Sequence, residues 1–131
     1  MSKTAQTIPL YEAIGGEDTV KALTTRFYVL MDSLPEAAHC RALHPQDLTT
    51  SRDKLTDYLM GWLGGPPVYV EKYGHPMLRR RHFGAAIDAQ ARDEWLLCFT
   101  RALDETVDHP QLRAIILEPI TRLAHHMQNM P

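Results

Sequence analysis

The stretch EDTVKALTTRFYVLMDSL, residues 17–34, has the clearest periodicity in the chain. Its apolar residues recur every three or four positions, and they are Val20, Leu23, Phe27, Leu30 and Leu34. That spacing places them on one face of an α-helix. Glu17 and Asp18 place negative charge where a helix N-terminus favours it, and Pro35 ends the pattern. This segment therefore predicts a long amphipathic helix.

Similar patterns cover most of the remaining chain. A short amphipathic start at residues 10–14 ends at Gly15-Gly16, and residues 36–43 predict a short helical turn. A second long helix is expected to start near Asp47 or Thr49, both good caps, and to end at the Gly-Gly-Pro-Pro sequence of residues 64–67. Residues 68–84 predict irregular structure, and the strand-like run at 68–70 is too short to build a sheet.

Two further helices are expected in the last third of the chain. Asp88 can cap a third long helix, and Asp108 precedes Pro110, which favours the first turn of a fourth. Pro119 lies inside that last pattern and is expected to kink it. The sequence thus predicts an all-α fold with about four substantial helices.

The same spacing predicts which side chains of these three helices are buried. They are Leu48, Leu55, Tyr58, Leu59 and Trp62 in the second helix, Trp95, Cys98, Phe99, Ala102 and Leu103 in the third, and Leu112, Ile115, Ile116, Ile120, Leu123 and Met127 in the fourth. Ser51 falls within the second stripe, so a small polar side chain is expected to point towards something buried.

Length and composition narrow the class of protein. The chain has 131 residues, is 44% hydrophobic and has a formal net charge of −2. This predicts one domain over residues 1–131 with residues 1–8 as an N-terminal extension, and it argues against nucleic-acid or anionic-membrane partners. No apolar run approaches the ~20 residues of a membrane span, and residues 1–7 lack the apolar core of a signal peptide. Two cysteines without a CxxC motif fit a reducing compartment, so a cytoplasmic location is expected.

Seven histidines are the unusual feature of this composition. His125 and His126 lie near the end of the last helix, where imidazoles commonly bond exposed carbonyls. His39 and His109 lie in polar surroundings and are interpreted as solvated. Glu36 and His39 have the spacing of a di-iron motif, but such sites need a second copy and two further glutamates.

His82 differs from the other histidines because it follows three arginines and precedes Phe83. From the residues alone it is either a hydrogen-bonded core histidine or a metal ligand. Arg79, Arg80 and Arg81 are either a solvated charge run or a clamp for carboxylates or phosphates.

Tyr28 and Trp95 place polar tips on two predicted buried faces. Their O–H and N–H groups need hydrogen-bond acceptors when buried. They are either ordinary core aromatics or two donors that converge on a polar ligand.

Several motifs of this chain together resemble those of the group II truncated haemoglobins. The motifs are Phe27-Tyr28, residues 62–66 (WLGGP), Tyr69, residues 74–79 (GHPMLR), Arg81-His82 and residues 93–98 (DEWLLC). They occur in the family's order, between residues 10–16 (LYEAIGG) and His126-Met127. The resemblance covers nearly the whole chain, and the ordered combination is far more specific than any single motif.

The resemblance implies a truncated globin fold, in which a 2-on-2 helical sandwich encloses haem b. By that resemblance His82 is the proximal iron ligand, and Tyr69, His75, Arg79 and Arg81 contact the haem propionates. The other haem contacts that it implies are Leu55, Tyr58, Leu59, Trp62, Met77, Phe83 and Trp95.

On the opposite face of the haem, Tyr28 and Trp95 occupy the ligand-stabilising positions of the family. His44 stands where the family commonly has Tyr or Phe, and Ser51 and Leu55 align with two distal-helix positions. Two roles are open for His44. It either donates a hydrogen bond to the ligand or to Tyr28, or it binds the iron as a sixth ligand.

The implied function is binding of dioxygen, and of NO and CO, at a five-coordinate iron, with oxygen transport as the associated role. The alternative is a redox enzyme, an NO dioxygenase or a peroxidase-like protein, which needs a separate reductase because the sequence shows no flavin or nicotinamide domain. A monomer or weak homodimer is expected.

Two other classes fit the sequence less well. A helical interaction module without cofactor leaves Ser51 and the arginines unexplained, and a non-haem metal protein lacks the ligand spacing. A Soret band in the purified protein distinguishes the haem protein from both.

Overall fold

The computed structural model of the chain describes residues 8–75 and 85–131. Within them the helices are α1 (Leu10–Ala13), α2 (Glu17–Ser33), the 3-10 helix η2 (Pro35–Ala37), α3 (Ala38–Arg41), α4 (Thr49–Trp62), α5 (Val68–Tyr73), α7 (Ala89–Thr106) and α8 (Pro110–Met127). The described residues form no strand, which confirms the predicted all-α class. None of their helices is both long and apolar enough to cross a membrane.

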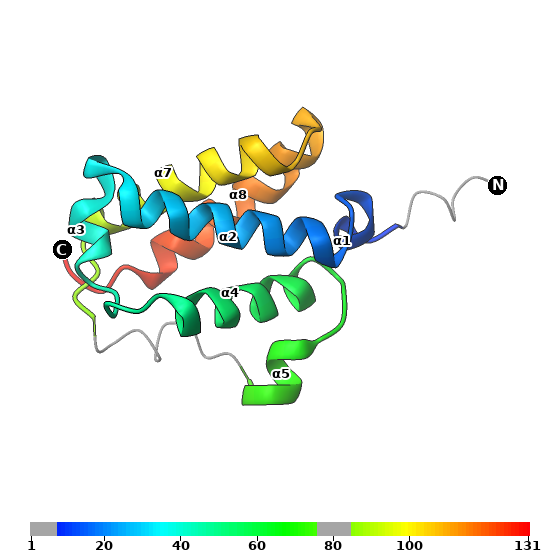
Figure 1. Cartoon of the computed structure of the whole chain (residues 1–131), viewed down its shortest axis with the longest axis horizontal. Helices are drawn as coiled ribbons and strands as arrows, with labels where there is room; N and C mark the ends of the chain where they lie inside the picture. Colours follow the sequence, from blue (N-terminus) through cyan, green and yellow to red (C-terminus); the bar gives the residue numbers. More distant parts are fainter. Residues whose placement is uncertain (1–7, 76–84) are drawn as a thin grey trace.

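The four long helices form two packed pairs. Helix α2 packs against both α4 and α7, and α7 packs against α8. Figure 1 shows α2 running between α4 and α7, with α8 crossing behind α2 and α5 beside the C-terminal end of α4. The short elements η2 and α3 also contact α7, so they close one end of the molecule.

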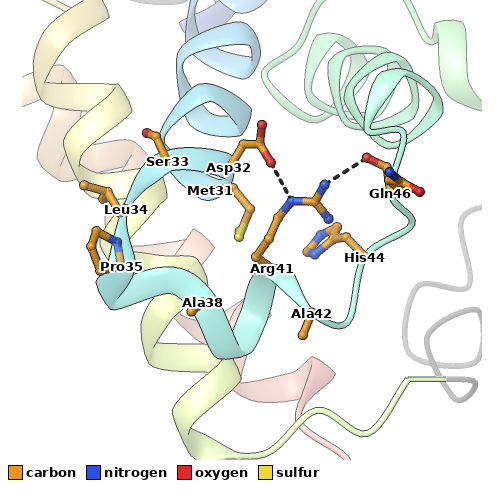
Figure 2. Close-up of a pocket in the computed structure, with 10 residues that line it drawn as sticks. All are labelled: Met31, Asp32, Ser33, Leu34, Pro35, Ala38, Arg41, Ala42, His44 and Gln46. Carbon is orange, nitrogen blue, oxygen red and sulfur yellow. Dashed lines mark hydrogen bonds and ion pairs between the residues drawn. The ribbon is translucent and has the colours of Figure 1, made fainter.

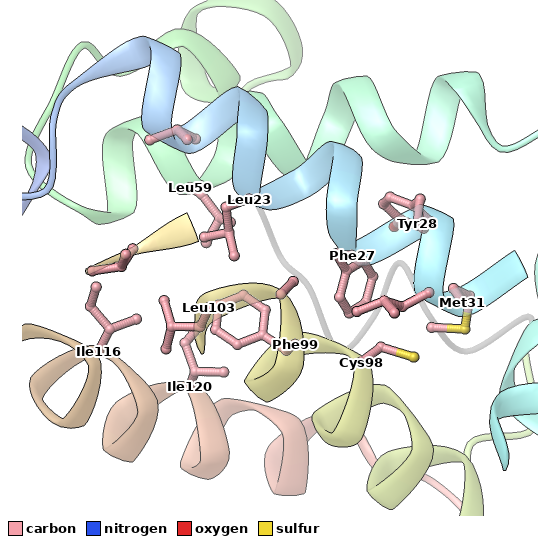
Figure 3. Close-up of a cluster of buried hydrophobic side chains, with 14 of the residues drawn as sticks. Leu23, Phe27, Tyr28, Met31, Leu59, Cys98, Phe99, Leu103, Ile116 and Ile120 are labelled. Atoms are coloured by element: carbon pink, nitrogen blue, oxygen red, sulfur yellow. The ribbon is translucent and has the colours of Figure 1, made fainter. Parts of the chain in front are cut away.

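The core lies where α2, α7 and α8 meet. Leu23 and Phe27 from α2, Phe99 from α7 and Ile120 from α8 are almost completely buried, and Figure 3 shows these side chains in one continuous cluster. Burial of a side chain of this size contributes about 1.5–3 kcal/mol. This cluster confirms the apolar faces predicted for residues 17–34 and for α7.

A buried hydroxyl pair joins α2 to α4. The Thr24 and Thr56 side-chain oxygens lie 2.6 Å apart, and Thr56 also lies 2.8 Å from the Arg52 carbonyl. Each hydroxyl also lies near a carbonyl of its own helix, Arg52 for Thr56 and Lys21, at 3.3 Å, for Thr24, so either hydroxyl can be the donor across the pair. A residue facing α2 can thus be polar when its hydrogen bonds are satisfied.

The burial of α4 differs from the predicted stripe. The buried residues of the helix are Thr56, Asp57, Leu59 and Met60, whereas Ser51, Leu55, Tyr58 and Trp62 are only half-buried. The prediction was made from apolar spacing alone, which cannot anticipate that a paired threonine faces α2. The predicted stripe is therefore an adjacent, partly exposed apolar face of the same helix.

The prediction of irregular structure from residue 68 onward is wrong for α5. Residues 68–73 form a helix although 68–70 is rich in β-branched residues. Pro66 and Pro67 precede it, and proline is well tolerated at a helix start because it has no amide hydrogen to leave unpaired. Tyr69 is buried, so packing overrides the local preference for strand.

Several helix ends agree with the predictions, and others differ. The Asp88 side chain accepts a hydrogen bond from the Ala91 amide and caps α7, as predicted. The N-cap of α4 is Leu48, and Asp47 instead accepts from the Thr49 amide. His109 is exposed, in agreement with its interpretation as solvated, and its Nδ1 in addition accepts from the Leu112 amide and caps α8.

Two expectations concern the interior of α8. The helix continues through Pro119 as one element, so any kink there remains a prediction. Ile115 is 53% exposed, which contradicts its predicted burial. The predicted burial of Ile116 and Ile120 is confirmed, and these two residues lie four positions apart on the side that faces α7.

Candidate functional site

An aromatic cluster connects α2 to α7 at the predicted ligand side. The Phe27 ring lies 4.7 Å from the Tyr28 ring in an edge-to-face contact and 5.0 Å from the Trp95 ring. Trp95 in turn stacks on Phe99 with centroids 5.3 Å apart. Phe27 thus fixes the spacing between Tyr28 and Trp95, the two predicted donors.

Tyr28 is a buried phenol, with 8% of the residue exposed. Burial raises the pKa of its hydroxyl far above the usual value, and the nearby Cys40 raises it further. The hydroxyl therefore stays protonated at any physiological pH. It is a permanent hydrogen-bond donor in surroundings of low polarity.

His44 lies next to Tyr28, in the segment between α3 and α4. The two rings contact edge to face with centroids 5.9 Å apart. Nδ1 of His44 lies 3.0 Å from the Cys40 carbonyl, which only accepts, so Nδ1 bears the proton. In the neutral ring Nε2 is then an acceptor with a lone pair.

Arg41 holds the segment that contains His44 against α2. Its guanidinium donates to Asp32 at 2.8 Å, to the Pro45 carbonyl at 2.9 Å and to the Gln46 carbonyl at 2.8 Å. Figure 2 shows the contacts with Asp32 and Gln46 among the residues that line a surface pocket, with the His44 ring next to the guanidinium. Three donated bonds fix the chain on both sides of His44, so its position depends on Arg41.

Helix α7 holds α3 in place through two acidic side chains. Nε2 of His39 lies 3.0 Å from Asp88, and the Cys40 amide donates to Glu94 at 2.8 Å. The side chain of His39 is 38% exposed, so it is partly solvated as predicted, and its ring in addition pairs with the residue that caps α7. These contacts fix α3, and through it His44, relative to Trp95.

The partly exposed face of α4 lies at the margin of the core. Leu55, Tyr58 and Trp62 on this face pack against core residues while remaining half-buried, and so does Trp95 on α7. Ser51 is half-buried one turn before Leu55. Leu59 differs, since it is 1% exposed and lies close to Leu23 within the core.

Only two of the predicted propionate contacts, Tyr69 and His75, lie within the residues that the structure describes. Tyr69 is buried, with its ring 6.0 Å from Tyr58, and His75 is exposed just after α5. The nearby Lys72 donates to Asp57 at 2.9 Å and ties α5 to α4. Met77, Arg79, Arg81, His82 and Phe83 lie outside the described residues, so their assigned roles remain predictions.

Comparison with known proteins places this arrangement in a family. The model of the family described as bacterial-like globin matches residues 9–129. The chain belongs to this globin family. It is 37% identical over 119 residues to the group 2 truncated haemoglobin YjbI of Bacillus subtilis, a match that covers 91% of this chain and 87% of that protein.

Solved structures confirm the group II fold. A group II 2-on-2 haemoglobin from Agrobacterium tumefaciens is 66% identical, with a TM-score of 0.95 and full coverage of both chains. The group II truncated haemoglobin of Bacillus anthracis is 37% identical with a TM-score of 0.89, over 96% of this chain and 95% of that one. The α2/α4 and α7/α8 pairs therefore form the 2-on-2 sandwich of a truncated globin.

Globin membership implies haem binding, and the described residues fit that group chemically. The half-buried face of Leu55, Tyr58 and Trp62 offers apolar and aromatic surface to a flat macrocycle. Tyr28 adds a protonated donor beside it. Apolar surface with a few directed polar groups is the composition expected of a cofactor site.

Two buried thiols lie near the ligand side, and sequence reasoning missed one of them, Cys40. Cys98 was expected to pack as a small hydrophobe, and it is fully buried. Burial, with Cys98 as a further cause, raises the pKa of the Cys40 thiol to about 12, and burial raises that of Cys98 to about 11. Both therefore stay protonated. Cys40 had no local signal, because its neighbours Tyr28 and Glu94 are remote in the sequence.

Proposed function

We propose that this truncated globin binds haem b through His82 and holds dioxygen on the opposite side of the haem. The observation that supports ligand binding is one aromatic cluster in which Tyr28 of α2 contacts His44 of the α3–α4 segment and is joined through Phe27 to Trp95 of α7. NO and CO are expected to enter the same site. The family relationship supports haem and a diatomic ligand in general terms.

The chain's own residues divide into a haem-holding set and a ligand set. Leu55, Tyr58, Leu59 and Trp62 supply the apolar surface of α4, and Tyr69 supplies a phenol for a propionate. Met77, Phe83, His75, Arg79 and Arg81 complete the haem-holding set by resemblance. When bound, the haem would supply an iron that His82 would ligate through a neutral imidazole and that would take up one diatomic molecule.

Tyr28 and Trp95 stabilise the ligand as fixed hydrogen-bond donors. A phenol O–H and an indole N–H that are already oriented lose little entropy when a partly negative ligand arrives. Burial strengthens each bond because the surroundings screen charge poorly. Ser51 and Leu55 line the same side and make the smaller contacts.

His44 orients Tyr28 in this proposal. With Nδ1 bonded to the Cys40 carbonyl, neutral His44 offers only an acceptor at Nε2. It cannot donate to a ligand in that form. Its ring contact with Tyr28 therefore favours a role in positioning the phenol.

A peroxidase-like activity is the second candidate function. Tyr28 and Trp95 can bind hydrogen peroxide with the same donors. The ring contacts that join Tyr58, Tyr69 and Tyr73 favour one-electron chemistry. NO dioxygenation is a related possibility that requires electrons from a separate reductase.

The dioxygen release rate tests the ligand-binding proposal. Tyr28→Phe and Trp95→Phe should each release dioxygen about 10- to 100-fold faster in stopped-flow measurements, the effect of one lost charge-assisted hydrogen bond. Tyr11→Phe, which removes a phenol of α1, is the matched control and should release dioxygen at the wild-type rate. Unchanged rates in both Tyr28→Phe and Trp95→Phe, with haem still bound, refute the assignment.

A further inference from the structure

Three tyrosines form a continuous series of ring contacts from α4 to the far end of α5. The rings of Tyr58 and Tyr69 lie 6.0 Å apart at 88°, and those of Tyr69 and Tyr73 lie 4.9 Å apart at 51°. The Lys54 ammonium lies 5.3 Å from the Tyr73 ring centroid and holds that ring against α4. Tyr69 and Tyr73 are four residues apart in α5, the spacing at which side chains of one helix contact each other, whereas the Tyr58–Tyr69 contact joins two helices.

Exposure changes along this series. Tyr58 is half-buried on the partly exposed face of α4, and Tyr69 is 6% exposed. Tyr73, at the end of α5, is 38% exposed. The series therefore begins at two residues assigned above to haem contact and ends at a phenol that reaches solvent.

Tyrosine is a side chain that can lose one electron and one proton to give a neutral radical. Electron transfer between rings weakens steeply with distance, so rings in contact exchange an electron far more readily than separated ones. Burial raises the pKa of the Tyr58 hydroxyl above its usual value, so this first phenol is not an anion at physiological pH. The two contacts thus provide a path for an electron to move from the surface towards the haem.

We propose that Tyr73 is a surface oxidation site at which small phenols reduce the haem-loaded protein after it has reacted with hydrogen peroxide. Tyr58 and Tyr69 pass the electron inward. The inference rests on the proposed haem binding and deepens its peroxidase-like alternative. The substrates are small phenols. They react at Tyr73 and need not reach the ligand site near Tyr28 and Trp95.

The chemistry balances with peroxide as the oxidant and the phenol as the reductant. One peroxide takes up two electrons and two protons and becomes two waters, with cleavage of its O–O bond. Each electron leaves Tyr73, whose phenolic proton passes to water, and the resulting tyrosyl radical takes a hydrogen atom from one phenol. Two phenols are therefore oxidised to two phenoxyl radicals for each peroxide consumed.

Without an added phenol, the radical should persist on Tyr73 and become visible. The experiment mixes the ferric, haem-loaded full-length protein with hydrogen peroxide and freezes it for electron paramagnetic resonance. Tyr73→Phe keeps the ring and its packing but removes the oxidisable hydroxyl, and Tyr11→Phe is the matched control. Guaiacol is the phenol used in the parallel turnover measurement, and peptide mapping locates dityrosine.

The proposal expects a tyrosyl signal in wild type and Tyr11→Phe that is lost in Tyr73→Phe, with an unchanged Soret band in all three. Dityrosine should map to Tyr73, and guaiacol oxidation should fall in Tyr73→Phe. A tyrosyl signal of full intensity in Tyr73→Phe, or none in wild type with haem bound, overturns the inference and leaves haem binding intact. Absence of a Soret band overturns both.

Discussion

The contacts that hold His44 in place argue against the second role that the sequence left open, in which this residue binds the iron as a sixth ligand. Because Nδ1 is bonded to the Cys40 carbonyl and Arg41 fixes the segment on both sides, the ring would have to break several contacts to reach another position. We therefore expect His44 to stay off the iron. His44→Phe, which restores an aromatic residue common in the family, should leave the low-spin fraction of the ferric protein unchanged.

Ferric absorption spectra recorded across pH provide the measurement for His44. Wild type and His44→Phe should show the same low-spin fraction at each pH. A low-spin fraction that grows with pH in wild type and is missing in His44→Phe shows instead that His44 is a sixth ligand.

Asp88 both caps α7 and pairs with His39. Its carboxyl group therefore makes the folding stability depend on pH. The Ala91 amide, and then His39, hold the pKa of its carboxyl below the usual value. A lowered pKa in the folded state means that the stabilising contribution is present above the unfolded pKa of about 3.9 and is lost as pH falls through the lower, folded value.

Asp88→Asn keeps a side-chain cap and removes the charge. Its melting temperature should be a few degrees below wild type at neutral pH, and the difference should shrink as the pH falls below about 4. Circular dichroism melts at several pH values measure this. A difference that is constant down to the acid range contradicts the role of the charge.

At the scale of elements, apolar periodicity predicted the long helices well because each buries one continuous face. It failed at α5, where Val68 and Val70 favour strand locally but packing of Tyr69 decides the conformation. It also misplaced the buried face of α4, because Thr56 faces α2 through a hydroxyl pair. The spacing of apolar residues reveals which helices are amphipathic. It gives no strong sequence signal for a buried pair of polar residues or for a helix of only six residues.

The turn between α4 and α5 requires glycine for two separate reasons. Gly64 has a φ of 96°, which favours glycine, and a Cβ on Gly65 would lie 2.6 Å from the Tyr11 ring. Gly65→Ala should therefore lower the free energy of unfolding by about 1–3 kcal/mol through overpacking.

Urea unfolding of Gly65→Ala in two backgrounds tests that explanation. The loss should be smaller when Tyr11 is also replaced by Ala, because the clash partner is then absent. An equal loss in both backgrounds shows that Tyr11 is not the cause.

At the scale of the whole molecule, the sequence predicted the 2-on-2 sandwich and the donors Tyr28 and Trp95 through ordered motifs. It could not predict the contacts that position them. His39 and Asp88 are 49 residues apart, and Cys40 and Glu94 are 54 apart, so no local pattern reports either contact. These links decide where α3 and His44 lie relative to α7.

The central claim is that the sandwich encloses a haem ligated by His82. The most direct test is titration of the apoprotein with hemin, followed by the Soret band, for wild type, His82→Ala and the control His125→Ala, which alters an exposed histidine of α8. Wild type and His125→Ala should saturate at one haem per chain. His82→Ala should lose stoichiometric uptake, and added imidazole should restore it by supplying the missing ligand. Retention by His82→Ala of one haem per chain with the wild-type five-coordinate spectrum would contradict the claim.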